Sequence, residues 1–253
     1  MNEHRNGAEE LELFVICEKS EFQGKADALS AFLGVPCLNG SDAGHECELI
    51  FTEDGLVLRN GEMEIRGDFT RLLRRIRNVN SEQIVKAARI RGHEGPLRII
   101  DATAGLGEDS FLLAAAGNTV KLFESDRVIY LLLRDALERA EADPGLQGIA
   151  QRMEVHNSDS IGYMSGITES PDLVFLDPMF PERQKSSLVK KKLQLIQQFE
   201  RPCSNEGELF DAAISCGPKK VIIKRPVKGP FLDGRKPSYS ITGKVIRYDC
   251  YVL

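Results

Sequence analysis

From Leu97 to the C-terminus, short apolar runs alternate with longer amphipathic segments. Five runs have the length and composition of buried strands, at residues 97–101, 119–123, 152–156, 173–176 and 220–224. The intervening segments predict helices, most clearly at 108–116 and 126–141. Because strands that alternate with helices form parallel sheets covered on both faces, residues 71–253 are predicted to form one α/β domain.

The end of the chain predicts two further strands, at residues 239–242 and 245–252, joined by a turn at Gly243. A terminal antiparallel hairpin beside a parallel sheet is typical of class I methyltransferases rather than of a plain dinucleotide-binding domain. The predicted fold is therefore α/β, with a Rossmann-like, mostly parallel seven-stranded sheet that ends in an antiparallel hairpin.

Residues 1–70 are predicted to form a separate, small α/β unit. A strand is expected at 11–16, and residues 48–58 are expected to form a hairpin that turns at Glu53-Asp54-Gly55. This part holds fifteen Asp and Glu residues against five Lys and Arg, a formal charge of −10, whereas residues 71–253 carry +5 of the total −5. No function is predicted for the acidic unit.

Positive charge in the larger domain is concentrated in two segments. Residues 71–91 contain seven Lys or Arg and one acid, Glu82, and residues 219–247 contain nine Lys or Arg and one acid, Asp233. Such clusters form phosphate-facing surfaces in nucleic-acid-binding proteins, and they also occur as ordinary solvated faces. Charge alone leaves both interpretations open.

The most informative motif joins the first strand of this domain to the next helix. Asp101 ends the strand, Gly105 and Gly107 form a tight turn, and Glu108 and Asp109 open the helix. The turn lacks the third glycine of a dinucleotide site, so a ligand without a pyrophosphate is predicted. S-adenosylmethionine fits, because its amino-acid tail needs backbone amides for a carboxylate and an acid for an ammonium. Glu108 and Asp109 also suit the positive end of the helix dipole without any ligand contact.

The ends of the next two strands supply the other predicted cofactor contacts. Glu124 ends the second strand, where an acid accepts hydrogen bonds from ribose hydroxyls, and Ser125 follows it. Asp126 is predicted to cap the next helix. Ser158 and Asp159 follow the third strand, where a hydroxyl or an acid meets the adenine amino group, and either residue equally suits a helix cap.

The fourth strand ends in Asp177-Pro178-Met179-Phe180-Pro181, an acid–proline–x–aromatic turn at the carboxyl edge of the sheet. An exocyclic amino nitrogen on a purine is a poor nucleophile, because its lone pair is delocalised into the ring. Asp177 and the carbonyl of Pro178 are expected to accept the amino hydrogens, and Phe180 is expected to stack on a base removed from its helix. No metal is predicted, because a sulfonium methyl is already activated and positioning supplies much of the rate.

Basic residues surround this turn. Arg183, Lys185 and Lys190 follow it closely, and Lys224 and Arg225 end the fifth strand at the same edge of the sheet. Contact with the phosphates of an RNA substrate is predicted for these cations. For the first three, the polar side of an ordinary helix is the alternative.

Together these motifs resemble the RsmJ family of bacteria, which methylates guanine N2 in small-subunit ribosomal RNA. The likeness begins near Asp68 and runs to the C-terminus. It rests on Asp101-Ala-Thr-Ala-Gly-Leu-Gly107, on Leu176-Asp-Pro-Met-Phe-Pro181 with Lys185-Ser-Ser-Leu-Val-Lys190, and on Val221-Ile-Ile-Lys-Arg-Pro226.

The resemblance implies a guanosine N2 product and S-adenosylmethionine as the methyl donor. The cofactor contacts that it implies are Glu108, Asp109, Glu124, Ser125, Ser158, Asp159 and Asp177. It further implies ribosomal RNA or the small ribosomal subunit as the partner. Two alternatives remain: an amino-methyltransferase of the same fold that acts on DNA adenine or protein glutamine, and a non-catalytic RNA-binding protein.

The sequence predicts a cytoplasmic protein that does not enter a membrane. The first ten residues lack the basic and apolar regions of a secretory signal, and no segment approaches roughly eighteen uninterrupted apolar residues. The six cysteines lack the C-x-x-C spacing of zinc sites and give no disulfide framework.

Overall fold

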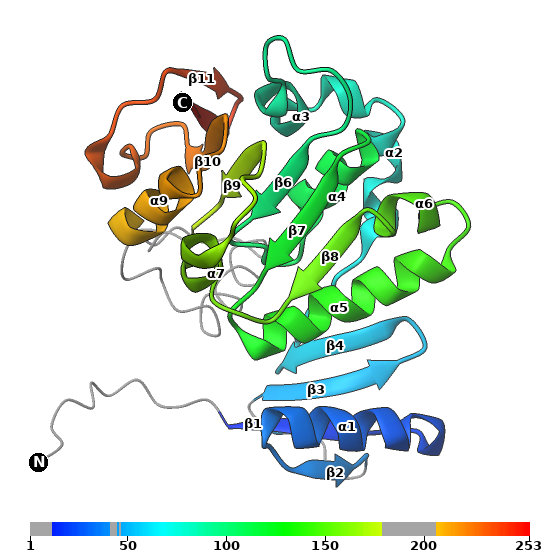
Figure 1. Cartoon of the computed structure of the whole chain (residues 1–253). Helices are drawn as coiled ribbons and strands as arrows, with labels where there is room; N and C mark the ends of the chain where they lie inside the picture. Colours follow the sequence, from blue (N-terminus) through cyan, green and yellow to red (C-terminus); the bar gives the residue numbers. More distant parts are fainter. Residues whose placement is uncertain (1–11, 41–44, 46, 179–205) are drawn as a thin grey trace, which may run out of the picture. The chain divides into compact units, whose positions relative to one another are not determined.

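The computed structural model describes residues 12–40, 45, 47–178 and 206–253. The chain divides into two compact units, Met1–Arg66 and Gly67–Leu253, each with its own β-sheet (Figure 1). The boundary that the sequence suggests, after residue 70, stays a prediction. In the described ranges, no helix combines the length and the apolar character needed to cross a membrane.

The first unit is a five-stranded sheet in the order β2-β1-β3-β4-β5. β1 (Leu13–Cys17) pairs in parallel with β2 (Cys37–Asn39) and β3 (Cys47–Thr52), and α1 (Gln23–Leu33) lies between β1 and β2 in sequence. β3, β4 (Gly55–Asn60) and β5 (Met63–Ile65) form an antiparallel meander. The predicted hairpin turn is confirmed, because Thr52 pairs with Gly55.

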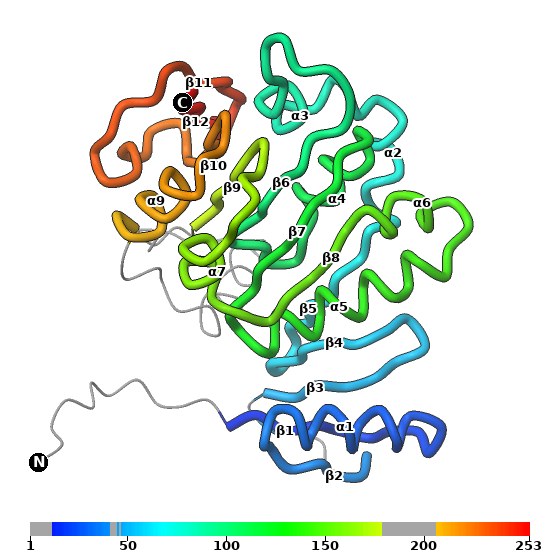
Figure 2. Tube along the Cα trace, viewed as in Figure 1, coloured from blue at the N-terminus to red at the C-terminus, as the bar shows by residue number. Residues whose placement is uncertain are grey.

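The second unit contains a seven-stranded sheet in the order β11-β12-β10-β9-β6-β7-β8, whose path Figure 2 follows. The strands are β6 (Arg98–Asp101), β7 (Thr119–Phe123), β8 (Met153–His156), β9 (Leu173–Leu176), β10 (Lys220–Pro226), β11 (Tyr239–Thr242) and β12 (Ile246–Val252). All neighbours are parallel except β12, which runs antiparallel to β10 and β11. The predicted Rossmann-like sheet with its terminal antiparallel hairpin is therefore confirmed.

Helices cover both faces of this sheet (Figure 1). The helices in the core of one face are α3 (Gln83–Ala88), α4 (Glu108–Ala115), α5 (Arg127–Ala142) and α6 (Gln147–Ala150). The helices in the core of the other face are α7 (Ser160–Gly166) and α9 (Glu206–Ser215). Burial on both faces explains why β9 is apolar at every position rather than at alternate ones.

A short helical segment precedes the sheet. The 3₁₀ turn Phe69–Leu72 leads into α2 (Leu73–Ile76), and another 3₁₀ turn, Val79–Ser81, leads to α3. Phe69 stacks on Phe111 of α4, with ring centroids 4.2 Å apart. This contact anchors the basic segment 71–91 beside the helix that follows β6.

The strand order places a switch point at β6. From β6 the chain moves outward to β7 and β8 on one side, and it then continues at β9 on the other side. α4, which follows β6, packs on one face of the sheet, and α9, which precedes β10, packs on the other. Open α/β sheets bind their ligands at such points.

Candidate active site

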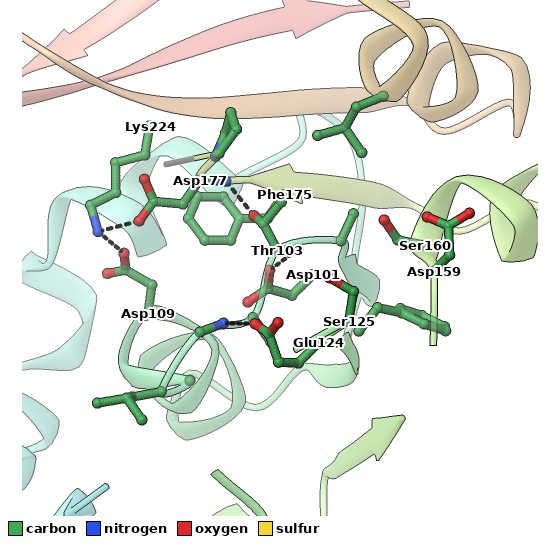
Figure 3. A pocket seen from close by; sticks show the side chains of 18 of the residues that line it. Asp101, Thr103, Asp109, Glu124, Ser125, Asp159, Ser160, Phe175, Asp177 and Lys224 are labelled. Carbon is green, nitrogen blue, oxygen red and sulfur yellow. Dashed lines mark hydrogen bonds and ion pairs between the residues drawn. The ribbon is translucent and has the colours of Figure 1, made fainter. Parts of the chain in front are cut away.

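A cavity of about 410 Å³ lies at the carboxyl edge of the sheet (Figure 3). Pockets for small ligands span roughly 300–1,000 Å³. Every residue predicted as a cofactor contact lines this cavity, namely Asp101, Gly105, Gly107, Glu108, Asp109, Glu124, Ser125, Ser158, Asp159 and Asp177. Within the described ranges, no group of three or more His, Cys, Asp or Glu side chains is arranged to hold a metal ion.

The glycine turn has a backbone shape that other residues adopt poorly. Gly105 and Gly107 have φ angles of 54° and 74°, in the left-handed region. A Cβ atom on Gly107 would lie 2.6 Å from Cδ1 of Leu133, so α5 packs directly against the turn. Gly107 is also the N-cap of α4 and has no side chain to accept from the first N–H groups of that helix. These backbone donors suit a carboxylate ligand.

Glu124 joins the end of β7 to the glycine turn. Its Oε2 accepts a hydrogen bond from the backbone N–H of Gly105 at 2.9 Å, and its Oε1 accepts from Asp126 at 2.8 Å. The residue is only 5% exposed, and this burial raises the pKa of Glu124 to about 7. Both contacts use carboxylate oxygens as acceptors, which is the role that ribose hydroxyls require.

The residues after β8 both cap a helix and line the cavity. Asp159 accepts hydrogen bonds from the N–H groups of Ile161 and Gly162 at 3.2 and 3.0 Å, so it caps α7. It still lines the cavity together with Ser158. The predicted cap at Asp126 is confirmed by its hydrogen bonds from the first turn of α5.

The sequence did not single out the apolar part of the cavity wall. Phe123 precedes Glu124 on β7, and Ile161 lies in the first turn of α7. Phe123 directly precedes Glu124 and Ile161 lies two residues after Asp159, and this closeness to predicted polar contacts is the signal that would have found them. Apolar side chains beside the predicted ribose acceptor, Glu124, suit a flat aromatic base.

The acid–proline turn contributes Asp177 and Pro178 to the cavity. The backbone N–H of Asp177 donates to Oγ1 of Thr103 at 2.6 Å, which ties the end of β9 to the glycine loop (Figure 3). The Asp177 side chain is 37% exposed. The predicted base-stacking residue, Phe180, lies outside the described residues, as do the predicted RNA contacts Arg183, Lys185 and Lys190.

The two cations that end β10 lie in different environments. Nζ of Lys224 lies 2.8 Å from Oδ2 of Asp109 and 2.8 Å from Oδ2 of Asp177 (Figure 3). Burial lowers the pKa of Lys224, but the carboxylates of Asp177 and Asp109 outweigh it and raise the pKa above its ordinary value. Lys224 is therefore engaged with two carboxylates, and its contact with a substrate phosphate stays a prediction.

Arg225 does not line the cavity. Its side chain is 1% exposed, its Nε donates to the carbonyl of Pro230 at 2.9 Å, and it forms an ion pair with Glu206 at 3.6 Å. A guanidinium buried in this way is not accessible to an RNA backbone. The predicted phosphate contact of Arg225 does not fit the structure, and the side chain instead holds the loop after β10.

Asp101 lies buried beneath the glycine turn. Its Oδ1 accepts from the backbone N–H of Thr103 at 3.1 Å, and its Oδ2 accepts from Oγ of Ser110 at 2.5 Å. Burial raises the pKa of Asp101 to about 7. The carboxyl group thus shapes the loop that borders the cavity.

We expect Asp101→Asn to stabilise the free protein, and to do so more at alkaline than at acidic pH. A carboxyl pKa that rises from about 3.9 in the unfolded chain to about 7 in the folded protein opposes folding increasingly as pH rises to 7. The amide keeps an acceptor for Thr103 and offers a donor to Ser110. We expect the gain in unfolding free energy to be ~2 kcal/mol larger at pH 8 than at pH 5. Urea unfolding at both pH values measures it, and an equal gain at both would contradict a buried charge.

Comparison with known proteins points to one family. Residues 38–253 match the family model described as "Putative SAM-dependent methyltransferase", where SAM is S-adenosylmethionine. Ribosomal RNA small subunit methyltransferase J of Thioalkalivibrio sulfidiphilus is 38% identical over 242 residues, which cover 92% of this chain and 94% of that protein. The protein of the same name from Cellvibrio japonicus is 35% identical, with 95% and 97% covered. The crystal structure of a SAM-dependent methyltransferase from Neisseria gonorrhoeae has a TM-score of 0.72 and 27% identity, with 94% and 95% covered.

Proposed function

The chain belongs to the family of ribosomal RNA small subunit methyltransferase J, and from this premise we propose that it methylates the exocyclic N2 amino group of a guanosine in 16S ribosomal RNA. One observation carries the choice of an amino group. Asp177, an acceptor for amino hydrogens, lies in the same cavity as Glu124 and the glycine turn. A cytoplasmic location follows from this substrate.

The cavity residues suit S-adenosylmethionine. Glu124 provides acceptors for the ribose, the N-terminal N–H groups of α4 suit the carboxylate of the amino-acid tail, and Phe123 and Ile161 offer apolar contact to the adenine. We assign Ser158 and Asp159 to the adenine amino group. When bound, the cofactor supplies a methyl group that is already activated by its sulfonium.

Asp177 is proposed to orient the nucleophile. Its Oδ2 is bound by Lys224, and within the described ranges no hydrogen bond to its Oδ1 is found. We assign Oδ1, together with the carbonyl of Pro178, to the two hydrogens of the guanine amino group. Holding these hydrogens turns the nitrogen lone pair toward the methyl group, so positioning supplies much of the rate. Stacking by Phe180 stays a prediction.

Exposed positive charge supports RNA as the substrate. Arg74, Arg77, Lys86 and Arg91 are all exposed on the segment 71–91. The acid of this segment, Glu82, is paired with Arg75 at 2.8 Å, so it does not neutralise the other cations. Clustered cations of this kind attract phosphates on a protein whose net charge is negative. Phosphate contacts by Arg183, Lys185 and Lys190 remain part of the proposal.

The proposal is tested by the product of methyl transfer. Purified protein is incubated with labelled S-adenosylmethionine and ribosomal RNA from cells that lack the gene, both as free RNA and as assembled small subunits. Nucleoside digestion is expected to yield labelled N2-methylguanosine from small-subunit RNA alone. Asp177→Ala protein in parallel controls for contaminating activities.

Other outcomes would overturn the proposal in different ways. A methylated adenosine would give the right reaction class with the wrong base. Label in DNA adenine or protein glutamine, with none in RNA, would move the substrate out of RNA. Tight binding of cofactor and RNA without transfer to either RNA form would indicate a non-catalytic RNA-binding protein.

A further inference from the structure

Lys224 is the one cation among the described residues that line the cavity. β10 pairs with β9 in parallel as far as Ile223 opposite Leu176, so Lys224 comes next beside Asp177. On its other side β10 pairs with β12, where Lys224 lies opposite Tyr248. The sheet thus places three polar side chains in one row at its carboxyl edge.

α4 completes this row from the same face of the sheet. Asp109, in the first turn of α4, binds Nζ of Lys224 through Oδ2 and accepts from the hydroxyl of Tyr248 through Oδ1, at 3.3 Å. Lys224 is therefore held from two sides, by Asp109 and by Asp177, and its side chain is only 25% exposed. An ammonium with both carboxylates at 2.8 Å is a fixed part of the site.

We propose that Lys224 is a positioning residue for methyl transfer: by binding Oδ2 of Asp177 it fixes that carboxylate and leaves Oδ1 as an ionised acceptor for the amino group. This inference rests on the proposed function. The backbone of Asp177 is fixed independently, by the hydrogen bond of its N–H to Thr103. Among the described residues, Thr103 thus holds the backbone of Asp177 and Lys224 holds Oδ2 of its side chain, and we assign Oδ1 to the substrate.

The charge of Lys224 matters because the other groups around Asp177 mostly favour its protonated form. Asp109 on α4 and Asp101 on β6 are acids, and Tyr248 on β12 is neutral. Arg225, the next residue on β10, is positive but is engaged with Glu206. Partial burial raises the pKa of Asp177, and the charge of Lys224 opposes that rise. A protonated Asp177 would carry an O–H donor in place of one acceptor and would hold the amino group less well.

The test compares Lys224→Met with Lys224→Arg, using Lys228→Met as a matched control on an exposed lysine of the turn that follows β10. Single-turnover methylation of small-subunit RNA is measured from pH 6 to 9 with both substrates saturating. We expect Lys224→Met to be about 100-fold slower at pH 7 and to recover toward pH 9. Lys224→Arg keeps the charge and is expected to keep the wild-type pH profile, with a rate within about tenfold. Lys228→Met should match the wild type.

A second experiment measures the pKa of the Asp177 carboxyl directly, in the absence of RNA. In protein labelled with ¹³C at aspartate carboxyls, the signal lost in Asp177→Asn identifies Asp177, and its titration gives a pKa. We expect this pKa to be higher in Lys224→Met than in the wild type by about one unit or more. Lys224→Gln, which keeps a donor without the charge, replaces Lys224→Met if that variant does not fold.

The outcomes separate this inference from the proposed function. A wild-type protein that methylates no RNA would contradict the proposed function, and the titration would then decide the role of Lys224 alone. An unchanged pKa of Asp177 in Lys224→Met overturns the inference whatever the substrate is. The inference is also overturned if Lys224→Met needs a higher RNA concentration for saturation while its pH profile stays that of the wild type, because loss of a phosphate contact gives that pattern.

Discussion

Asp177→Ala is expected to slow methyl transfer to RNA by ~10³-fold at saturating substrates while leaving the Kd for S-adenosylmethionine within about threefold. Asp177 lies at the end of β9, and its side chain contacts Lys224 rather than the glycine turn or Glu124. Its removal leaves Lys224 bound to Asp109 and Glu124 bound to Gly105, so the residues proposed to bind the cofactor keep their partners. Calorimetric titration of the cofactor and single-turnover transfer measure the two effects separately.

Asp211→Ala is a suitable control for this variant. Asp211 lies on α9, has a mostly exposed side chain and, like Asp177, pairs with a cation, here Arg235 at 2.7 Å. Unlike Asp177, it does not line the cavity. It should leave both rate and affinity unchanged. If Asp177→Ala instead weakens cofactor binding strongly, Asp177 belongs to the binding site and the amino group must be oriented by other groups.

The parallel sheet was predictable because burial on both faces leaves a simple pattern. β9 is apolar throughout and is bounded by polar residues, so its limits in the sequence and in the structure coincide. The acidic unit gives weaker signals. α1 buries only Ala26 and Leu29, and β2 and β5 have three residues each, too few for an alternation to be recognised. These three elements were not predicted.

The residues predicted as cofactor contacts line one cavity for a related reason. Each of them ends or follows a strand of the parallel sheet, and the carboxyl ends of such strands share one edge. The bridge from Lys224 to Asp109 was not predictable, because it joins residues 115 positions apart through a strand register and a helix position. Sequence position alone assigned Lys224 to phosphate.

The alternation of side chains along β10 separates Lys224 from Arg225, and this pattern is visible in the sequence. Successive side chains on a strand point to opposite faces of the sheet, so Lys224 and Arg225 could not both face α4. Ile222, two residues before Lys224, lies in the core on the α4 side, and Ile223, two before Arg225, lies in the core on the α9 side. Alternation therefore predicts that only one of the two cations reaches the cavity beside Asp109.

Glu124→Ala is expected to have the opposite effect to Asp177→Ala. Loss of the proposed ribose acceptor should raise the Kd for S-adenosylmethionine by ~100-fold, because hydrogen bonds to a charged group contribute about 1.5–3 kcal/mol each. At saturating cofactor the transfer rate should stay within about tenfold of the wild type, since Glu124 does not contact Asp177. A variant with normal affinity and a lost rate would place Glu124 in the chemical step instead.

The pH dependence of cofactor affinity gives an independent check on Glu124. Burial raises its pKa to about 7 in the free protein, whereas ribose hydroxyls need the ionised carboxylate as acceptor. The wild-type affinity should therefore increase by about tenfold from pH 6 to pH 8 and change little above that, as the carboxylate becomes fully ionised. Glu124→Gln has no charge to lose and should bind weakly with a flatter pH profile. If the affinities of wild type and Glu124→Gln vary with pH in the same way, the titrating group is another acid of the cavity, and buried Asp101 is the next to substitute, because burial also raises its pKa to about 7.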